Sequence, residues 1–193
     1  DLRRQRQMCI RDRMSNILLK FNIIITSVFL FGCVESGSIG NNKNSERIIA
    51  DKKKVDAFFD SSFKAFDRSM QPLAKYEGKV IVAYFWATWC ASCVRETTML
   101  KELEEQYRDK NVSFLGIAVD NTDKVENFVK KNGITFEILI GGNDAIDLSK
   151  QMGNLRKGLP YMVVIDADNN FIAKFLGETS KEKLEEAIIK AVL

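Results

Sequence analysis

The stretch that decides the fold runs from Val80 to Cys93 and reads VIVAYFWATWCASC. Its first part, Val80–Trp86, is an unbroken apolar run, which is typical of a strand buried on both faces of a sheet. Its last part places Cys90 and Cys93 three positions apart, where a helical pattern of apolar residues begins. Positions i and i+3 share a helix face, with α-carbons roughly 5 Å apart, inside the ~4.4–6.8 Å that a disulfide accepts. The stretch therefore predicts a strand that delivers a reversible disulfide to the first turn of a helix.

The helix start also predicts reactivity for Cys90. The first cysteine meets the unpaired N–H groups and the positive dipole end of the helix. Both lower the pKa of a thiol and favour the thiolate, which is the nucleophile in thiol–disulfide exchange. A static disulfide without turnover is the structural alternative. The position beside Trp89, directly after a buried strand, favours the redox interpretation.

Composition indicates one packed domain and an appendage. The chain has 193 residues, of which 46% are hydrophobic and two are proline. Residues 1–13 hold five arginines and two aspartates, and five minus two accounts for the whole net charge of +3. The remaining residues therefore balance to zero. No basic face for nucleic acid or anionic lipid is predicted.

The chain contains no histidine. This excludes Cys–His and Ser–His–Asp catalysis and removes the commonest zinc ligand. The cysteines are Cys9, Cys33, Cys90 and Cys93, and only the last two form a closely spaced pair. A zinc site with four thiolates would need both cysteines of the N-terminal region. We therefore expect no metal and no cofactor other than the redox-active disulfide.

The first 33 residues resemble leader sequence. Residues 1–13 resemble translated sequencing-adaptor read-through ahead of a start at Met14, and a genuine basic N-region is the alternative. Residues 14–33 read as a signal peptide, with a positive charge at Lys20 and an apolar core at Phe21–Phe31. That core is too short for a membrane span, which needs ~20 residues. We expect export from the cytoplasm.

Leu30–Cys33, LFGC, resembles a bacterial lipobox, in which the cysteine is lipidated. Phe31 departs from the small or β-branched residue that is usual at its position. Lipidation of Cys33 would tether the protein to a membrane surface by its N-terminus. The alternative is an uncleaved or ordinarily cleaved signal peptide in which Cys33 is incidental. We expect a lipid-anchored protein of the bacterial periplasm, and Val34, by resemblance to lipoprotein sorting signals, favours the outer membrane.

Residues 34–54 are rich in Ser, Gly, Asn and Lys and predict a flexible tether, which leaves residues 55–193 as the domain. Between Val55 and Met70 apolar residues recur at helical spacing, which favours an amphipathic helix. The family resemblance given below instead implies a short hairpin from Phe63 to Leu73. We expect a helix to about Asp60 and extended chain after it.

Strand and helix patterns alternate through the rest of the domain. Asn132-Gly133 is typical of a helix end, and Thr179 with Glu182 is typical of a capping box at a helix start. The elements expected after the cysteines are a helix to about Asp109, a strand at 112–119, a helix at 122–132, a strand at 136–140, a helix at 144–152, a hairpin of strands at 161–165 and 171–176, and a last helix. This order predicts an α/β fold with a mixed sheet covered on both faces.

Two motifs carry a specific resemblance. FWATWC at 85–90 is followed by Cys93 and Arg95-Glu96, and Gly158-Leu159-Pro160 is followed by VVID at 163–166. Together they resemble the thioredoxin superfamily, and within it the TlpA/ResA-like branch of bacterial extracytoplasmic thiol–disulfide oxidoreductases. The resemblance covers residues 72–193 firmly and 55–71 weakly. It implies a thioredoxin-like fold, a mixed central sheet flanked by helices, with the branch's extra strand–helix insert at residues 136–153.

The resemblance also implies roles. Cys90 is similar to the cysteine that attacks a partner disulfide, and Cys93 to the cysteine that resolves the mixed disulfide. Trp89 is expected beside the partner. Pro160 is similar to the proline held cis next to the disulfide, and Leu159 before it is expected to touch both the disulfide and the partner.

The chain departs from the branch at three positions. Ser92 stands where proline usually precedes the second cysteine, which removes rigidity and adds a hydroxyl near Cys90. We expect the reduction potential to move to a more oxidising value. Thr98 stands where a helix-kinking proline is common, and Tyr84 where thioredoxins bury an acid and this branch often has asparagine. Glu96 is the candidate proton acceptor for Cys93, and a solvated or paired structural carboxylate is its alternative role.

These features predict an extracytoplasmic thiol–disulfide oxidoreductase that acts as a protein-disulfide reductase. The resemblance implies a membrane electron donor and protein thiol clients, such as the haem-binding cysteines in cytochrome c biogenesis, and we expect a monomer. A peroxiredoxin-related peroxidase is one alternative, although the Pro-x-x-x-Thr-x-x-Cys context of those enzymes is absent. A binding or chaperone module without redox cycling is the other.

Overall fold

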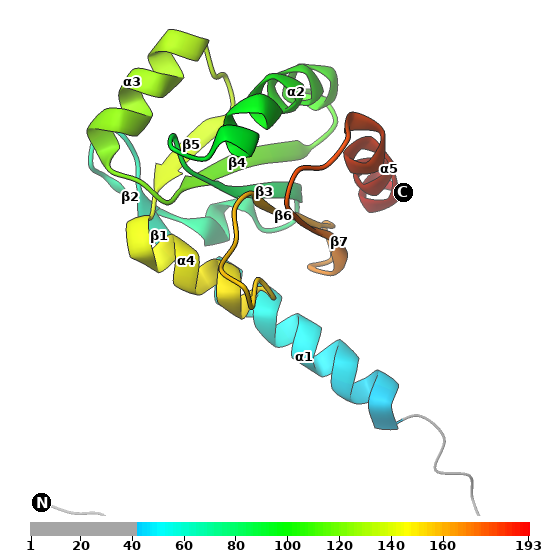
Figure 1. Ribbon diagram of the computed structural model, residues 1–193. Coiled ribbons are helices and arrows are strands. Elements are labelled where there is room, and N and C mark those ends of the chain that lie inside the picture. The colour runs from blue at the N-terminus through cyan, green and yellow to red at the C-terminus, as the bar shows by residue number, and fades with distance from the viewer. Residues whose placement is uncertain (1–41) are drawn as a thin grey trace, which may run out of the picture. The chain divides into compact units, whose positions relative to one another are not determined.

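The computed structural model describes residues 42–193, with side chains from residue 51 onward (Figure 1). The predicted read-through segment, the signal peptide, Cys33 and the first part of the predicted tether lie outside the described residues. Within residues 42–193, no helix is both long and apolar enough to cross a bilayer.

A seven-stranded sheet in the order β2-β1-β5-β4-β3-β6-β7 forms the centre of the domain. β3 pairs parallel with β4 and antiparallel with β6, and β4 pairs parallel with β5. All seven residues of β3 are buried, as its apolar run predicts. The strands are β1 (Ser62–Lys64), β2 (Met70–Pro72), β3 (Val80–Trp86), β4 (Val112–Ala118), β5 (Glu137–Ile140), β6 (Tyr161–Ile165) and β7 (Phe171–Leu176).

Within residues 42–193, five α-helices and one 3-10 helix, η1 (Leu73–Tyr76), accompany the sheet. Tyr84 and Trp86 of β3 point into an apolar cluster with residues of α2, α3 and α5, whereas Ile81 and Phe85 point into a second cluster with residues of α1 and α4. Figure 1 shows these two groups of helices on opposite faces of the sheet. The predicted mixed α/β sheet with two covered faces is confirmed. The α-helices are α1 (Asn42–Phe59), α2 (Ala91–Tyr107), α3 (Thr122–Asn132), α4 (Gly142–Gln151) and α5 (Lys181–Val192).

The N-terminal helix corrects one prediction. α1 begins at Asn42, so residues 42–54 of the predicted 34–54 tether are helical. Asn, Ser and Lys suggested a flexible segment, but residues 41–54 contain no Gly or Pro and end in the good helix formers Ala and Lys. The end of the helix is anchored by Val55 and Phe58, which are fully buried. Because an anchored helix extends at little cost per residue, α1 continues back beyond the apolar pattern.

The end of α1 and the start of α5 test two further predictions from the sequence. After α1 ends at Phe59, β1 and β2 form an antiparallel hairpin, so the hairpin implied by the resemblance is confirmed and a helix continuing to Met70 is wrong. The N-cap of α5 is Ser180, whose side chain accepts a hydrogen bond from the Lys183 N–H. The predicted cap at Thr179 is therefore wrong by one residue, and the Thr179 N–H donates to Glu96 instead of to Glu182.

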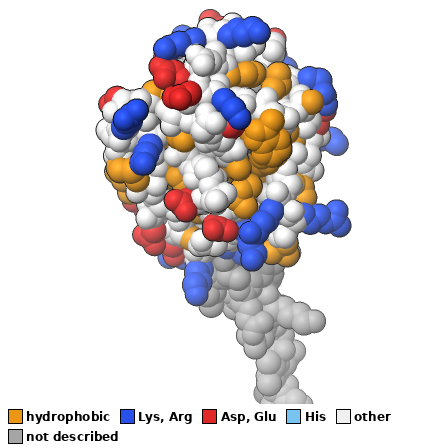
Figure 2. All heavy atoms as spheres, turned by 60° about the vertical axis from the view of Figure 1, so that its left-hand side comes forward, with side chains coloured by type: hydrophobic (Ala, Val, Ile, Leu, Met, Phe, Trp, Pro, Cys, Tyr) orange, Lys and Arg blue, Asp and Glu red, His pale blue; other side chains and the backbone are white. Residues whose placement is uncertain are grey.

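The surface carries mixed charge. On the face seen in Figure 2, basic and acidic side chains are interspersed, and hydrophobic side chains gather between them. Trp89, Leu155 and Leu176 are among the exposed large apolar residues of the described chain. Of these, Trp89 adjoins the cysteine pair in sequence.

Candidate active site

Cys90 and Cys93 lie where β3 passes into α2. The chain leaves the sheet after Trp86, turns through residues 87–90, and starts α2 at Ala91 with Cys90 as the N-cap. The two cysteines form a disulfide with α-carbons 5.2 Å apart, which agrees with the spacing argument from the sequence. Cys93 is fully buried, whereas Cys90 is 8% exposed. Of the two residues, only Cys90 therefore keeps any surface toward a partner.

Two donors surround the Cys90 sulfur. The Cys93 N–H donates to Cys90 Sγ at 3.2 Å, and the Ser92 Oγ lies 3.4 Å from the same sulfur. The first is one of the N–H groups left free at a helix start, and it would stabilise a thiolate at Cys90 in the reduced protein. The Ser92 hydroxyl can add a second hydrogen bond that a proline at that position cannot supply.

The loop before Cys90 is held by Asp120. The Thr88 N–H donates to Asp120 Oδ2 at 3.2 Å, and the Thr88 hydroxyl donates to the same oxygen. Asp120 follows β4, the parallel neighbour of β3, and its other oxygen accepts from the Asn121 N–H at 2.8 Å. The sequence interpretation missed this residue. The sequence shows only that Asp120 follows a predicted strand; its position beside Thr88 follows from the parallel pairing of β3 and β4, because the carboxyl ends of adjacent parallel strands meet at one edge of a sheet.

The segment before β6 lies at the same end of the sheet as the cysteine pair, because Tyr161 at the start of β6 pairs with Phe85 near the end of β3. The Leu159–Pro160 peptide bond is cis, as the resemblance implies. Leu159 is half-buried and packs against the apolar cluster that contains Cys90 and Cys93. Trp89 is 66% exposed, in contrast to the fully buried Trp86. The structure therefore confirms the cis bond before Pro160, and the contacts of Trp89 and Leu159 with a partner stay predictions.

Asn154 fixes the shape of this segment. Its side chain is fully buried, and its amide donates to the Gly158 carbonyl at 2.8 Å while its oxygen accepts from the Gly158 N–H at 3.1 Å. The amide also donates to Ser149 Oγ at 3.2 Å. Asn154 thus closes the loop that leads into Leu159 and Pro160. No sequence signal distinguished this asparagine from an ordinary polar loop residue.

Glu96 is a buried carboxyl group one helical turn after Cys93. It is 3% exposed, and its Oε1 accepts from the Thr179 N–H at 2.6 Å. Among the described residues, no hydrogen-bond partner contacts its buried Oε2. Burial raises the pKa of Glu96, and the hydrogen bond from Thr179 and the neighbouring Tyr84 oppose that rise. The group is therefore not solvated, but its hydrogen bond from Thr179 is also one that a structural carboxylate would make, and its role in proton transfer stays a prediction.

Tyr84 lies beneath the same turn. It is almost fully buried in β3, and its hydroxyl donates to the Cys93 carbonyl at 2.9 Å. Burial raises the pKa of Tyr84 far above its ordinary value, and the nearby Glu96 raises it further. The phenol therefore stays protonated and acts as a donor.

The rim of the site carries one charged pair that joins α2 to the segment before α5. The Arg95 guanidinium binds the Glu178 carboxylate through two hydrogen bonds, of 3.0 Å and 2.6 Å. Both side chains are largely exposed. Over residues 51–193, no cluster of three or more Cys, Asp or Glu side chains is arranged to hold a metal ion.

Comparison with known proteins gives consistent matches. The sequence profile described as Redoxin matches residues 53–193. The thiol-disulfide oxidoreductase ResA of Bacillus thuringiensis subsp. konkukian (strain 97-27) is 36% identical over 121 residues, which are 61% of this chain and 66% of that protein. The chain thus matches just under two thirds of that relative's length.

Solved structures match at lower identity. A thiol:disulfide interchange protein of the thioredoxin family from Chlorobium tepidum TLS has a TM-score of 0.62 at 24% identity, covering 69% of this chain and 93% of that one. A secreted thiol-disulfide isomerase from Corynebacterium glutamicum has a TM-score of 0.63 at 21% identity, covering 69% and 83%. These similarities confirm the predicted thioredoxin-like fold.

Proposed function

Because this chain belongs to the Redoxin family, we propose that it is a thiol–disulfide oxidoreductase that exchanges disulfides with protein thiols through Cys90 and Cys93. One observation carries the proposal: the disulfide closes at a strand–helix junction with one slightly exposed and one fully buried cysteine. This asymmetry suits exchange, which needs one sulfur to meet the partner and another to act from within. The name of the ResA relative supports the same chemistry.

The reaction runs in two steps from the reduced protein. The Cys90 thiolate attacks one sulfur of a client disulfide, a Cys90–client bond forms, and the other client sulfur leaves as a thiolate. Cys93 then loses its proton and attacks Cys90. The Cys90–Cys93 disulfide forms and the second client sulfur leaves, so that two electrons have passed from the cysteine pair to the client.

Glu96 is the proposed proton acceptor for Cys93 in the second step. It lies three residues after Cys93 on α2 and is buried with it. Its raised pKa brings its proton affinity nearer to neutral pH, where general bases are most effective. Its Oε2 is the carboxyl oxygen left for this role, because Oε1 accepts from the Thr179 N–H.

The proposed setting is outside the cytoplasm. A lipid on Cys33 would anchor the protein to a membrane surface, and the LFGC motif supports this. A membrane electron donor would reduce the cysteine pair again after each reaction, and this pair would be the only redox group. The protein would act as a monomer. The clients would be haem-binding cysteines of apocytochrome c or other extracytoplasmic thiols. A reduction potential of roughly −120 mV, typical of strong oxidants such as DsbA, would contradict the proposal that the protein acts as a reductase.

Covalent trapping tests the cysteine roles. In a cell extract, Cys93→Ser should hold the mixed disulfide on Cys90, and the client should be released by reductant. The matched control Cys90→Ser should trap nothing. Trapping by Cys90→Ser alone would reverse the roles, and full complementation by the double serine variant would favour the binding-module alternative. Peroxide turnover without a thiol partner would favour the peroxidase alternative.

A further inference from the structure

The turn between β3 and α2 carries Trp89 beside the cysteine pair. The Cys90 N–H donates to the Ala87 carbonyl at 3.2 Å, which makes Thr88 and Trp89 the two central residues of a β-turn. The Trp89 side chain is largely exposed, so its direction depends chiefly on the backbone of this turn. Whatever fixes the turn therefore also fixes the side chain that a client would meet next to Cys90.

Asp120 holds this turn from the neighbouring strand. The Val119 N–H donates to the Trp86 carbonyl at 2.7 Å, just beyond the end of β4. One residue further on, Asp120 Oδ2 accepts from the Thr88 N–H at 3.2 Å and also from the Thr88 hydroxyl. The first central residue of the turn is thus bound through both its backbone and its side chain.

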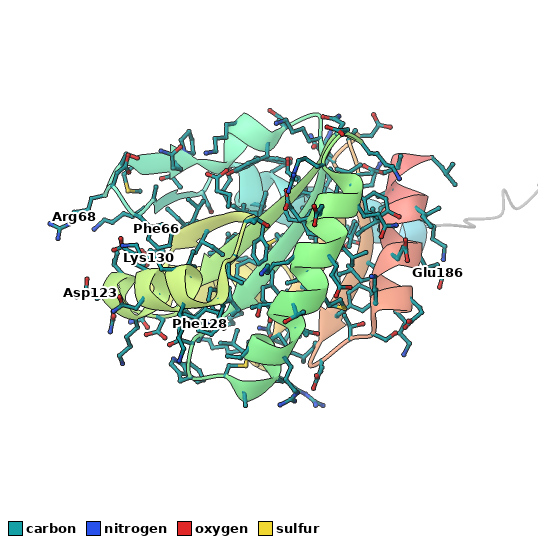
Figure 3. The ribbon with its side chains drawn as sticks, turned by 90° about the horizontal axis from the view of Figure 1, so that it is seen from above. Phe66, Arg68, Asp123, Phe128, Lys130 and Glu186 are labelled. Carbon is teal, nitrogen blue, oxygen red and sulfur yellow. A yellow bond between two sulfur atoms is a disulfide. The ribbon has the colours of Figure 1, made fainter. Side chains whose placement is uncertain are left out.

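Asp120 is itself fixed by α3. Its Oδ1 accepts from the Asn121 N–H at 2.8 Å, and Asn121 is the N-cap of α3. The helix is held on the sheet by Phe128, whose ring centroid lies 5.2 Å from that of the buried Trp86. Figure 3 labels Asp123 in the first turn of this helix and Phe128 further along it. The carboxylate therefore joins the turn to a helix that is packed on the sheet.

The bonds at Asp120 require a carboxylate. Two backbone N–H groups and one hydroxyl, from Thr88 and Asn121, donate to its two oxygens. An ionised carboxylate has acceptor sites only, whereas an amide has one oxygen and two N–H donors. In Asp120→Asn, one of the two backbone N–H groups would therefore face another donor and lose its bond. The link between the turn and α3 would then be broken at one of its two ends.

We propose that Asp120 is a positioning residue that holds Trp89 ready for a protein client and so gives the protein a preference for protein disulfides over small disulfides. The inference rests on the proposed function, in which Cys90 attacks the client. A protein client can contact Trp89 while its disulfide meets Cys90, whereas a small disulfide needs only the sulfur. A side chain that is fixed before binding does not have to be ordered during binding, which favours the protein client. The Cys90 sulfur takes its hydrogen bond from the Cys93 N–H within α2, so its reactivity is set by the helix and not by Asp120.

Rate constants with two disulfides test this preference. The reduced full-length protein is mixed with insulin, which is a protein substrate, or with 2-hydroxyethyl disulfide, which is small and uncharged. Asp120→Asn should lower the second-order rate constant with insulin about fivefold, because Trp89 must then be ordered in each encounter. It should change the rate constant with 2-hydroxyethyl disulfide little. The ratio of the two rate constants therefore measures the preference.

Asp166→Asn is the matched control. Asp166 Oδ1 also accepts from two backbone N–H groups, those of Asp168 at 3.0 Å and Asn170 at 2.8 Å. Asp166 follows Ile165, which pairs with Ile81 near the start of β3, so it lies at the end of the sheet away from the cysteine pair. The control changes the net charge by the same amount as Asp120→Asn, and it should leave both rate constants unchanged.

The mobility of Trp89 gives a second measurement. The chain has two tryptophans, so labelling with fluorinated tryptophan gives two fluorine resonances, and the one that is lost in Trp89→Phe belongs to Trp89. Asp120→Asn should narrow that resonance, because the side chain gains motion, and should leave the resonance of the buried Trp86 in place. Thr88→Val removes only the hydroxyl and should give smaller changes of the same kind. It takes the place of Asp120→Asn if that variant does not fold.

The outcomes separate this inference from the proposed function. Equal losses with insulin and with 2-hydroxyethyl disulfide, or an unchanged insulin rate constant in a folded variant, would overturn the role of Asp120 while leaving the exchange chemistry in place. Absence of exchange by the native protein with either disulfide would instead defeat the proposed function.

Discussion

The two sulfurs of one disulfide lie in different surroundings, and this difference determines the chemistry at the scale of single residues. Cys90 meets a helix N–H, the Ser92 hydroxyl and solvent, whereas Cys93 lies fully buried in the turn that carries Glu96 and contacts Tyr84. A thiolate is therefore stabilised at Cys90 and disfavoured at Cys93. The order of attack follows from that inequality.

Ser92 should set part of the reduction potential. Its hydroxyl lies 3.4 Å from Cys90 Sγ and would stabilise the thiolate of the reduced form, which makes the pair more oxidising. Ser92→Ala and Ser92→Pro should both shift the potential by about 20–30 mV to more negative values, the worth of one weak hydrogen bond to a charged group. Equilibration with glutathione buffers measures the shift. Ser113→Ala, on β4, serves as a control, and a potential that stays constant in both Ser92 variants would refute the role.

Glu96 should make the protein less stable as pH rises. Burial raises its pKa in the folded protein above the unfolded value near 4.5, so the folded state binds more protons between the two pKa values. The free energy of unfolding therefore falls as the pH rises through that window, and it stays lower at higher pH. Glu96→Gln keeps an oxygen for the Thr179 N–H and removes the charge, so it should be more stable than the native protein at pH 7 and equal at pH 4. The midpoints of urea unfolding at both pH values check this prediction. A midpoint that falls with pH in the variant as much as it does in the native protein would contradict it.

At the scale of elements, three loops converge on the end of β3. The segment before α2 is held by Asp120, the segment before β6 by Asn154, and the segment before α5 by Glu96. The side chains of Asp120 and Glu96 each bind the backbone of a different loop. The Asn154 side chain binds the backbone of Gly158, four residues later in the chain. The site is therefore assembled from helix and strand ends, whereas the sheet supplies only their common edge.

Asn154 offers the sharpest test at this scale. Asn154→Ala would leave the half-buried Gly158 N–H and carbonyl without the partners they have now, at a cost of about 2 kcal/mol in the free energy of unfolding. Second-order exchange rates should fall as well, because Leu159 and Pro160 lose their fixed position. Asn132→Ala, which removes an exposed bond to the Phe128 carbonyl, should change both quantities little. Equal losses in the two variants would contradict the positioning role.

At the scale of the whole molecule, sequence patterns predicted what depends on near neighbours. The apolar run of β3, the cysteine spacing and the left-handed cap at Gly133, with φ of 58°, all follow from local geometry and are confirmed. The start of α1 was wrong because burial of Val55 and Phe58 against the sheet supports a helix whose N-terminal half has no apolar pattern of its own. The cap at Thr179 was wrong because its N–H is taken by Glu96, 83 residues earlier in the chain.

The two missed site residues depend on the fold in different ways. Asp120 contacts Thr88 across 32 positions, and its role appears only when β3 and β4 are known to be parallel neighbours. Asn154 works through burial, which a single asparagine in a polar loop does not reveal. Both roles depend on how the chain is arranged in the folded protein, which sequence patterns leave undetermined.

The central claim is that Cys90 and Cys93 pass two electrons to a protein disulfide. Its most direct measurement is rapid mixing of the reduced full-length protein with insulin, acid quenching, alkylation and mass spectrometry of both chains. We expect Cys90 and Cys93 to become resistant to alkylation together, while the two cysteines of one insulin disulfide become alkylated. Two results would contradict the claim. One is reduction of insulin while Cys90 and Cys93 remain free to be alkylated after the quench, and the other is no reduction by a fully reduced and folded protein.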